Sequence, residues 1–284
     1  MSKLLKSFSS QEVERAPGDA RVVAVASGKG GVGKTSLVVN LSLALAELDR
    51  RVVILDADLG LANVEVLMGV TPLYTLRDCL CGGKEITEIL TPAPLGVQII
   101  SGGSGFLELA HLSARQQQKI VAALDFLDGA DFILVDTGAG ISKNVLGFLA
   151  AAGEVIVVLT PEPTSLTDGY ALIKILAGFG LHRQVMLVVN RAADEREGES
   201  TAARIKAVAD RFLQIDLVYL GTIVEDRAVR RAVRRQEPYV LWAPQSPAAQ
   251  AVRSLARRLA GAGSQVPDGR SFSGFLAKVI NLFR

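Results

Sequence analysis

Short apolar runs of strand length alternate along this chain with longer stretches in which apolar residues recur every three or four positions. The first run, at 21–27, leads into a glycine-rich loop and then into an apolar-periodic stretch over about 34–48. Further runs of strand length stand at 51–56, 97–101, 132–136, 155–160 and 185–190. This alternation predicts an α/β fold, with a mostly parallel sheet and helices on both of its faces.

The two ends of the chain depart from this alternation. Residues 1–20 are polar and mixed, and we expect a mobile arm there. The segment 261–270 (GAGSQVPDGR) has the composition of a linker. After it, 271–284 resumes an apolar period that predicts a helix with one apolar face. The simplest partition is one domain over 21–260 with an extension at each end.

The composition fits this fold and restricts the function classes. Apolar residues make up 49% of the 284 positions and aromatic residues only 5%, which suits a core of buried parallel strands. No stretch reaches the roughly 18 apolar residues of a membrane-spanning helix, and residues 1–20 lack the apolar core of a signal peptide. We therefore expect a cytoplasmic protein. The net charge of +2 gives no reason to expect nucleic acid as a partner.

The segment GKGGVGKT, at 28–35, matches the pattern of a phosphate-binding loop and has a predicted strand before it and a helix after it. Its glycines let backbone N–H groups face phosphate oxygens, and the helix adds the positive end of its dipole. Lys34 is expected to reach the β- and γ-phosphates of ATP, and the Thr35 hydroxyl to bind Mg²⁺. A plain glycine-rich turn is the alternative. The predicted nucleotide contacts in this loop are Gly28, Gly30, Gly31, Val32, Gly33, Lys34, Thr35 and Ser36.

Acidic residues stand at the carboxyl ends of two predicted strands, where α/β sheets bind their ligands. Asp56 and Asp58 follow the run that begins at 51, and Asp136 ends the run that begins at 132. Phosphoryl transfer needs carboxylates near Mg²⁺ and the attacking water. We predict that Asp136 holds the Mg²⁺ shell and that Asp56 supports it from behind. A helix cap is the alternative role for an aspartate in this position.

The loop contains a second lysine, Lys29, and with it the segment resembles the deviant Walker A pattern KGGxxGK[ST] of the MinD/ParA family. The resemblance implies a slow ATPase that dimerises when ATP is bound, with Lys29 reaching the partner's nucleotide. It places Asp58 in switch I, where it helps to position the hydrolytic water. Asn190, and more weakly Arg191, correspond to adenine contacts of the family, and Asp226 to a second base-contacting stretch. A solvated loop lysine is the alternative for Lys29.

Four segments resemble the FlhG group of that family, also called FleN or YlxH, which controls the number and placement of flagella. They are 55–69, 100–105, 136–142 and 155–174. The resemblance implies FlhF, a GTPase, and the flagellar switch (C-ring) proteins as partners. The arm reads LLKSFSSQEVERA and lacks the DQAxxLR motif through which many of these proteins stimulate FlhF. The resemblance therefore does not extend to that stimulation.

Other members of the family supply alternative functions. MinD positions the division septum, and ParA proteins bind DNA during partition. Iron–sulfur scaffolds commonly use CxxC, but Cys79 and Cys81 have the wrong spacing, and they are too close for an ordinary disulfide. One predicted helix carries an arginine face, which is either simply solvated or a surface for DNA, an acidic partner or anionic lipid. Its residues are Arg227, Arg230, Arg231, Arg234 and Arg235.

The predicted C-terminal helix resembles the membrane-targeting sequence of MinD. Its apolar face consists of Phe272, Phe275, Leu276, Val279, Ile280 and Phe283. Such a helix can lie in a membrane interface, where one copy binds weakly and two copies in a dimer bind more firmly. The resemblance implies reversible attachment of 271–284 to the inner face of the cell membrane. The alternative is that this face packs on its own domain.

Overall fold

The computed structural model describes residues 20–58, 63–102, 127, 129–262, 274–275 and 277–279. The predicted N-terminal arm and linker lie almost wholly outside these residues. Among the described residues, no helix is long and apolar enough to cross a membrane.

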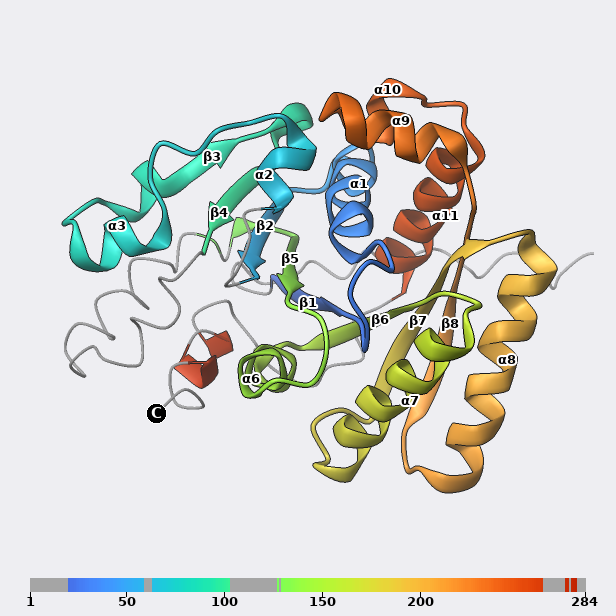
Figure 1. Ribbon diagram of the computed structural model, residues 1–284. Helices are drawn as coiled ribbons and strands as arrows, with labels where there is room; N and C mark the ends of the chain where they lie inside the picture. The colour runs from blue at the N-terminus through green and yellow to red at the C-terminus, as the bar shows by residue number, and fades with distance from the viewer. Residues whose placement is uncertain are drawn as a thin grey trace, which may run out of the picture.

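An eight-stranded sheet runs through the described part of the chain in the order β3-β4-β2-β5-β1-β6-β7-β8 (Figure 1). All neighbouring strands are parallel except β3 and β4. The strands are β1 (Arg21–Ala26), β2 (Val52–Ala57), β3 (Leu90–Pro92), β4 (Gln98–Ser101), β5 (Phe132–Thr137), β6 (Glu154–Leu159), β7 (Gln184–Ala192) and β8 (Asp216–Val224). The predicted α/β fold is confirmed, although the apolar pattern did not predict β3 and β8.

Helices cover both faces of the sheet (Figure 1). One layer contains α6 (Lys143–Ala151), α7 (Pro163–Gly178) and α8 (Glu195–Phe212), and the other contains α1 (Lys34–Ala46), α10 (Tyr239–Trp242) and α11 (Pro247–Gly261). The described residues also include the helices α2 (Asn63–Met68), α3 (Leu76–Cys81) and α9 (Arg227–Arg235) and the short 3₁₀ turns Ile86–Ile89 and Pro94–Gly96.

The alternation of side chains along each strand explains why both layers are apolar. In β1, Val22 and Ala24 belong to the core under α6 and α7, whereas Val23 and Val25 belong to the core under α1 and α11. Because successive side chains point to opposite faces, a strand buried on both sides must be apolar throughout. This is why the strands in the middle of the sheet are apolar runs, with polar residues only at or near their ends.

The C-terminal segment contributes two described apolar residues to the core. Phe275 and Val279 are fully buried in the same layer as α6 and α7. The ring of Phe275 stacks on that of Phe148, from α6, with 6.5 Å between the ring centroids. The short helical piece lies beside α6 in Figure 1. In this structure the described part of the apolar face therefore packs on its own domain.

Candidate nucleotide-binding site

The glycine-rich loop connects β1 to α1 at the carboxyl end of the sheet. Ser27 donates a hydrogen bond from Oγ to the carbonyl of Lys29, 2.9 Å away, within the loop. Gly33 precedes α1 with φ of +94°, and a Cβ at this position would lie 2.3 Å from Nδ2 of Asn190. Asn190 donates from Nδ2 to the carbonyl of Val32, at 2.7 Å. Glycine is therefore required at 33, and the end of β7 braces the loop from the side.

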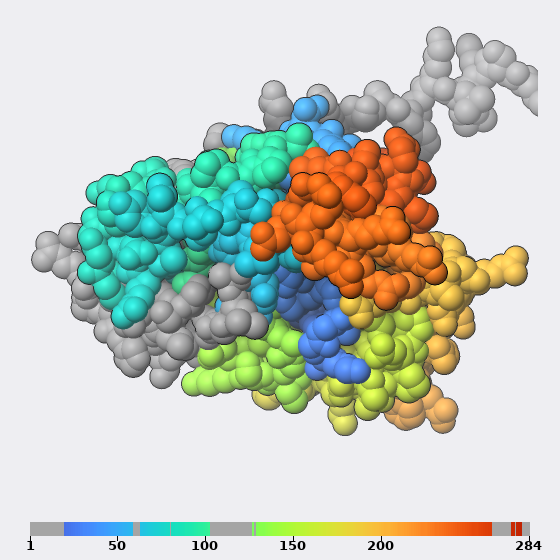
Figure 2. Space-filling view, turned by 45° about the horizontal axis from the view of Figure 1, so that its top comes forward, coloured from blue at the N-terminus to red at the C-terminus, as the bar shows by residue number. Residues whose placement is uncertain are grey.

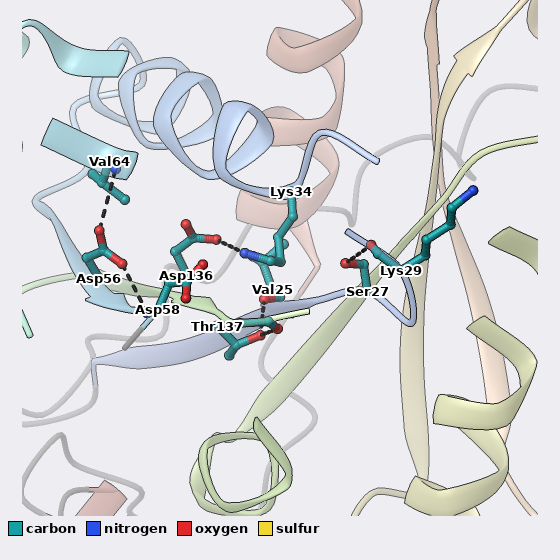
Figure 3. Close-up of polar contacts among 10 residues, drawn as sticks. Val25, Ser27, Lys29, Lys34, Asp56, Asp58, Val64, Asp136 and Thr137 are labelled. Carbon is teal, nitrogen blue, oxygen red and sulfur yellow. Dashed lines mark hydrogen bonds and ion pairs between the residues drawn. The ribbon is translucent and has the colours of Figure 1, made fainter. Parts of the chain in front are cut away.

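Lys34 and Asp136 form a buried ion pair at the base of this loop (Figure 3). Nζ of Lys34 lies 2.6 Å from Oδ1 of Asp136, and the two side chains are 8% and 0% exposed. The second carboxylate oxygen, Oδ2, has no hydrogen-bond partner among the described residues. Burial raises the pKa of Asp136, and the nearby Lys34 and the Thr35 side chain partly offset that rise. The predicted Walker A lysine and Walker B aspartate are thus brought together.

Asp56 lies directly beside Asp136, because parallel β2 and β5 place these residues in register. Its carboxylate accepts hydrogen bonds from the backbone N–H groups of Asp58, at 3.1 Å, and Val64, at 3.5 Å (Figure 3). Burial raises the pKa of Asp56 to about 8, with further contributions from Asp136 and Glu65. The backbone contacts hold Asp56 behind the ion pair, which fits a supporting role.

Glu65 is a buried acid that the sequence reading did not single out. It is 3% exposed, accepts a hydrogen bond from the hydroxyl of Ser101, and leaves its other oxygen, Oε2, without a described partner. The one available signal was a carboxylate inside the otherwise apolar run VEVLM at 64–68. Glu65 adds negative charge around Asp56.

The donor set of this site fits Mg²⁺ and phosphate. Carboxylate and hydroxyl oxygens are the ligands that Mg²⁺ prefers, commonly one or two from the protein together with phosphate and water. Thr35 and Asp136 would supply them, and the orphaned Oδ2 of Asp136 is a buried acceptor without a donor. A Cβ built on Gly30 or Gly31 would meet nothing within 4 Å, so the crest of the loop is open to a ligand. Figure 2 shows this loop, in blue, at the surface below the orange α9–α10 region.

The loop after β5 lies between the ends of β1 and β2. The Thr137 hydroxyl donates to the carbonyl of Val25, at 2.9 Å, and the N–H of Gly140 donates to the carbonyl of Ser27, also at 2.9 Å. Oδ1 of Asp58 lies 3.8 Å from the position that a Cβ on Gly138 would take. The predicted switch residue Asp58 and the glycine-containing loop are therefore neighbours.

Lys29 points away from this group of acids (Figure 3). Its Nζ donates to Oε2 of Glu162, at 3.2 Å, and to the Thr164 hydroxyl, at 3.0 Å. The Lys29 side chain is 40% exposed, so it is accessible to another subunit. The sequence predicted the lysine but not these two partners: Glu162 precedes α7 as its N-cap, and Thr164 lies in the first turn of that helix.

The three predicted base contacts occupy neighbouring strand ends, β7 and β8. Arg191 follows Asn190 in the left-handed conformation, with φ of 58°, and its N–H donates to the Asn190 side chain at 3.0 Å. Asp226 accepts from the N–H of Ala228, at 2.7 Å, and of Ala248, at 3.2 Å, and so caps α9 and holds α11. Contact of these residues with a base stays a prediction.

Comparison with known proteins agrees with this geometry. Residues 19–260 match the ParA family, described as NUBPL iron-transfer P-loop NTPase. The chain is 45% identical over 240 residues to the antiactivator FleN of Pseudomonas aeruginosa, covering 84% of this chain and 86% of that protein. It is 34% identical to the flagellum site-determining protein YlxH of Helicobacter pylori, covering 84% and 81%.

Solved MinD structures share the fold. The MinC:MinD cell division complex of Aquifex aeolicus gives a TM-score of 0.69 at 28% identity and covers 89% of this chain and 100% of that one. MinD with Mg-ADP from Pyrococcus horikoshii gives 0.66 at 28% identity, covering 87% and 100%.

The sheet, the glycine-rich loop and the strand-end acids define a P-loop NTPase that binds nucleotide and Mg²⁺. The chain belongs to the ParA family and is an ATPase of that family, with FleN and YlxH among its relatives. The predicted resemblance to the MinD/ParA family, and within it to the FlhG group, is confirmed.

Proposed function

We propose that this chain is an ATP-dependent switch that controls the number or placement of flagella. The buried Lys34–Asp136 pair below an open glycine-rich loop carries the switch part of the proposal. The identity to FleN and YlxH supports the flagellar part. FlhF and the flagellar C-ring proteins are the proposed partners, and the inner face of the cell membrane is the proposed location.

In the proposed cycle, Lys34 exchanges Asp136 for the β- and γ-phosphates of ATP, and Asp136 and Thr35 become ligands of Mg²⁺. The bound Mg²⁺ neutralises charge on the phosphates. Asp58 orients the attacking water, and its neighbour Gly138 lets the loop after β5 follow the γ-phosphate. Release of the nucleotide after hydrolysis lets Lys34 return to Asp136.

Dimerisation supplies the second half of the site in this proposal. Lys29 leaves Glu162 and Thr164 and reaches the nucleotide of a partner subunit. An exposed pair of this kind contributes little to stability, so it can be exchanged easily. Light scattering after gel filtration tests the step: Asp58→Ala should trap an ATP dimer, and Lys34→Ala should stay monomeric. Two monomeric variants would argue against the dimer switch.

Membrane attachment requires the C-terminal helix to leave the core. Phe275 and Val279 are buried in the described structure, so these two residues of the apolar face are unavailable to lipid while they are docked. We propose that the ATP dimer releases this helix and that hydrolysis lets it dock again. Two released copies then bind the membrane together, which a single weak anchor does not do.

Co-sedimentation with anionic vesicles tests this release. Wild type should pellet with ATP but not with ADP, and deletion of 271–284 should abolish pelleting. Phe148→Ala removes the ring on which Phe275 packs, so it should raise pelleting with ADP. Phe179→Ala, at a phenylalanine that is 73% exposed, is the matched control and should change nothing. Equal pelleting of wild type in all nucleotide states would refute nucleotide-controlled release.

The biological role is tested in cells of the source organism. Deletion of the gene should change the number or position of flagella, and wild type but not Lys34→Ala should restore them. A division-septum defect with normal flagella would favour a MinD-like role, and loss of plasmid or chromosome partition a ParA-like one.

A further inference from the structure

Helix α9 presents a continuous cationic surface that the nucleotide site does not use. At about 100° per residue, its five arginines fall within an arc of about 140° of the helix circumference. All five are exposed, whereas Ala232, which lies outside this arc, is buried. We name this surface the α9 arginine face; it consists of Arg227, Arg230, Arg231, Arg234 and Arg235.

Acidic residues of the same chain neutralise only part of this face. Arg230 lies 3.6 Å from Glu225 and Arg235 lies 3.2 Å from Glu237, and both are exposed pairs that solvent screens. No described residue forms an ion pair with the other three arginines of the face. Most of its charge is therefore available to another molecule.

The needs of the helix itself do not explain this arrangement. The first turn of α9 contains Arg227 and no acidic residue, although the helix dipole disfavours cations there. Pairs such as Arg227–Arg231 and Arg230–Arg234 place like charges four residues apart, where they repel each other. The helix is held instead by the Asp226 cap at its start and by the buried Ala232.

The residues around the face favour a protein as the binding partner. Protein interfaces are rich in arginine and tryptophan and poor in lysine. The segment 226–243 contains no lysine, and Trp242 lies under the guanidinium of Arg235, 5.7 Å from it. Val233, at the border of the face, is 42% exposed and offers an apolar contact. A phosphate backbone is bound by lysine and arginine alike and gains little from such apolar neighbours.

We propose that the α9 arginine face is a docking surface for an acidic segment of a partner protein, with carboxylates on the arginines and apolar side chains against Val233 at one border of the face and Trp242 at the other. The face lies on the outer surface, next to the nucleotide site. Figure 2 shows the α9–α10 region, in orange, projecting above the blue phosphate loop. A partner bound there sits within reach of the elements that surround the nucleotide.

A random dodecapeptide display library, selected on the full chain, tests the proposal without a known partner. Selection is repeated on Arg231→Glu/Arg234→Glu and on Arg196→Glu/Arg257→Glu, a control with the same charge change at exposed arginines of α8 and α11. Peptides that depend on α9 should be acidic and contain an apolar residue. As synthetic peptides they should bind the α9 double variant at least about tenfold more weakly than wild type, and the control about as tightly.

A second pair of variants separates a protein surface from a general anion site. Val233→Ser should weaken the selected peptides several-fold, whereas Val208→Ser, at a residue of α8 that is 41% exposed, should not. Duplex DNA and anionic vesicles are the competing probes at about 0.15 M salt. The proposal is wrong if no selected peptide depends on α9, or if DNA or vesicles bind more tightly than the peptides in an α9-dependent way. Circular dichroism confirms that each variant is folded.

Discussion

Nζ of Lys34 lies 2.6 Å from Oδ1 of Asp136, inside a site where both side chains are almost excluded from solvent. The two residues come from different elements, the start of α1 and the end of β5. Each therefore neutralises a charge that would otherwise be buried alone. In the proposed cycle nucleotide and Mg²⁺ offer both groups new partners, so binding would replace an internal ion pair.

The first prediction concerns the stability of the nucleotide-free protein. Lys34→Met should lower the free energy of unfolding by about 3–5 kcal/mol, because it leaves the Asp136 carboxylate buried and unpaired. Lys34→Met/Asp136→Asn should recover most of that loss without recovering ATPase activity. Urea denaturation at pH 7 measures both variants. A double variant no more stable than Lys34→Met would show that the unpaired Asp136 carboxylate is not the cause of the lost stability.

The second prediction concerns pH and Asp56. Its pKa is about 8 in the folded protein against an ordinary value of 3.8, because burial and the neighbouring Asp136 and Glu65 disfavour the charged form. The folded state therefore holds the proton more tightly than the unfolded chain. Stability of the nucleotide-free protein should fall as pH rises from about 4 to about 8, and each pKa unit corresponds to about 1.4 kcal/mol.

Asp56→Asn isolates this contribution, because it cannot ionise. Thermal unfolding at a series of pH values should show a flatter profile for the variant than for wild type, with the largest gain in stability above pH 8. Asp216→Asn, at an exposed aspartate, is the control and should keep the wild-type slope. Parallel profiles for wild type and Asp56→Asn would contradict the raised pKa.

The third prediction separates the two lysines of the phosphate loop. Lys29→Gln should bind a fluorescent ATP analogue about as well as wild type, because Lys29 points away from the Lys34–Asp136 pair. Its ATPase rate should be at least about tenfold lower, since the proposed charge from the second subunit is missing. The wild-type rate per subunit should rise with protein concentration and the variant's should not. Lys206→Gln, in α8, is the control and should behave like wild type.

The site shows which relationships a sequence pattern can and cannot reveal. Asp56 and Asp136 could be predicted as neighbours, because both end apolar runs and the carboxyl ends of parallel strands share one edge. The contact of Glu65 with Ser101 could not, since it joins residues 36 positions apart and no periodicity records it. The partners of Lys29, Glu162 and Thr164, are more than 130 positions away for the same reason.

The same limit applies to the elements that were missed or left undecided. Strand β8 is interrupted by Gly221, where its register with β7 shifts, so it does not read as a continuous strand. The apolar face of the C-terminal helix fits a membrane and a protein core equally well. In the structure Phe275 packs on the ring of Phe148. The sequence of 271–284 by itself does not indicate that this ring is available as a partner.

The fourth prediction concerns the contact between α2 and the end of α9. Gly69, which follows α2, has φ of +67°, and a Cβ there would lie 2.7 Å from the carbonyl oxygen of Gln236. Gly83 has a similar φ of +70° but open space around it. Alanine at either position adds strain of about 1–2 kcal/mol from the left-handed conformation. Gly69→Ala should lower the free energy of unfolding clearly more than Gly83→Ala, because its new Cβ must also push the end of α9 away.

Urea denaturation of Gly69→Ala and Gly83→Ala therefore measures the contact as a difference, with the backbone strain cancelled. Gly69→Ala should lose at least about 1 kcal/mol more free energy of unfolding than Gly83→Ala, because the backbone carbonyl of Gln236 cannot move aside as a flexible side chain does. Equal losses would show that α9 moves freely with respect to α2. Val64, the second residue of α2, donates its N–H to Asp56. An unequal loss would therefore support a structural link from the acidic end of β2, through α2, to the end of α9.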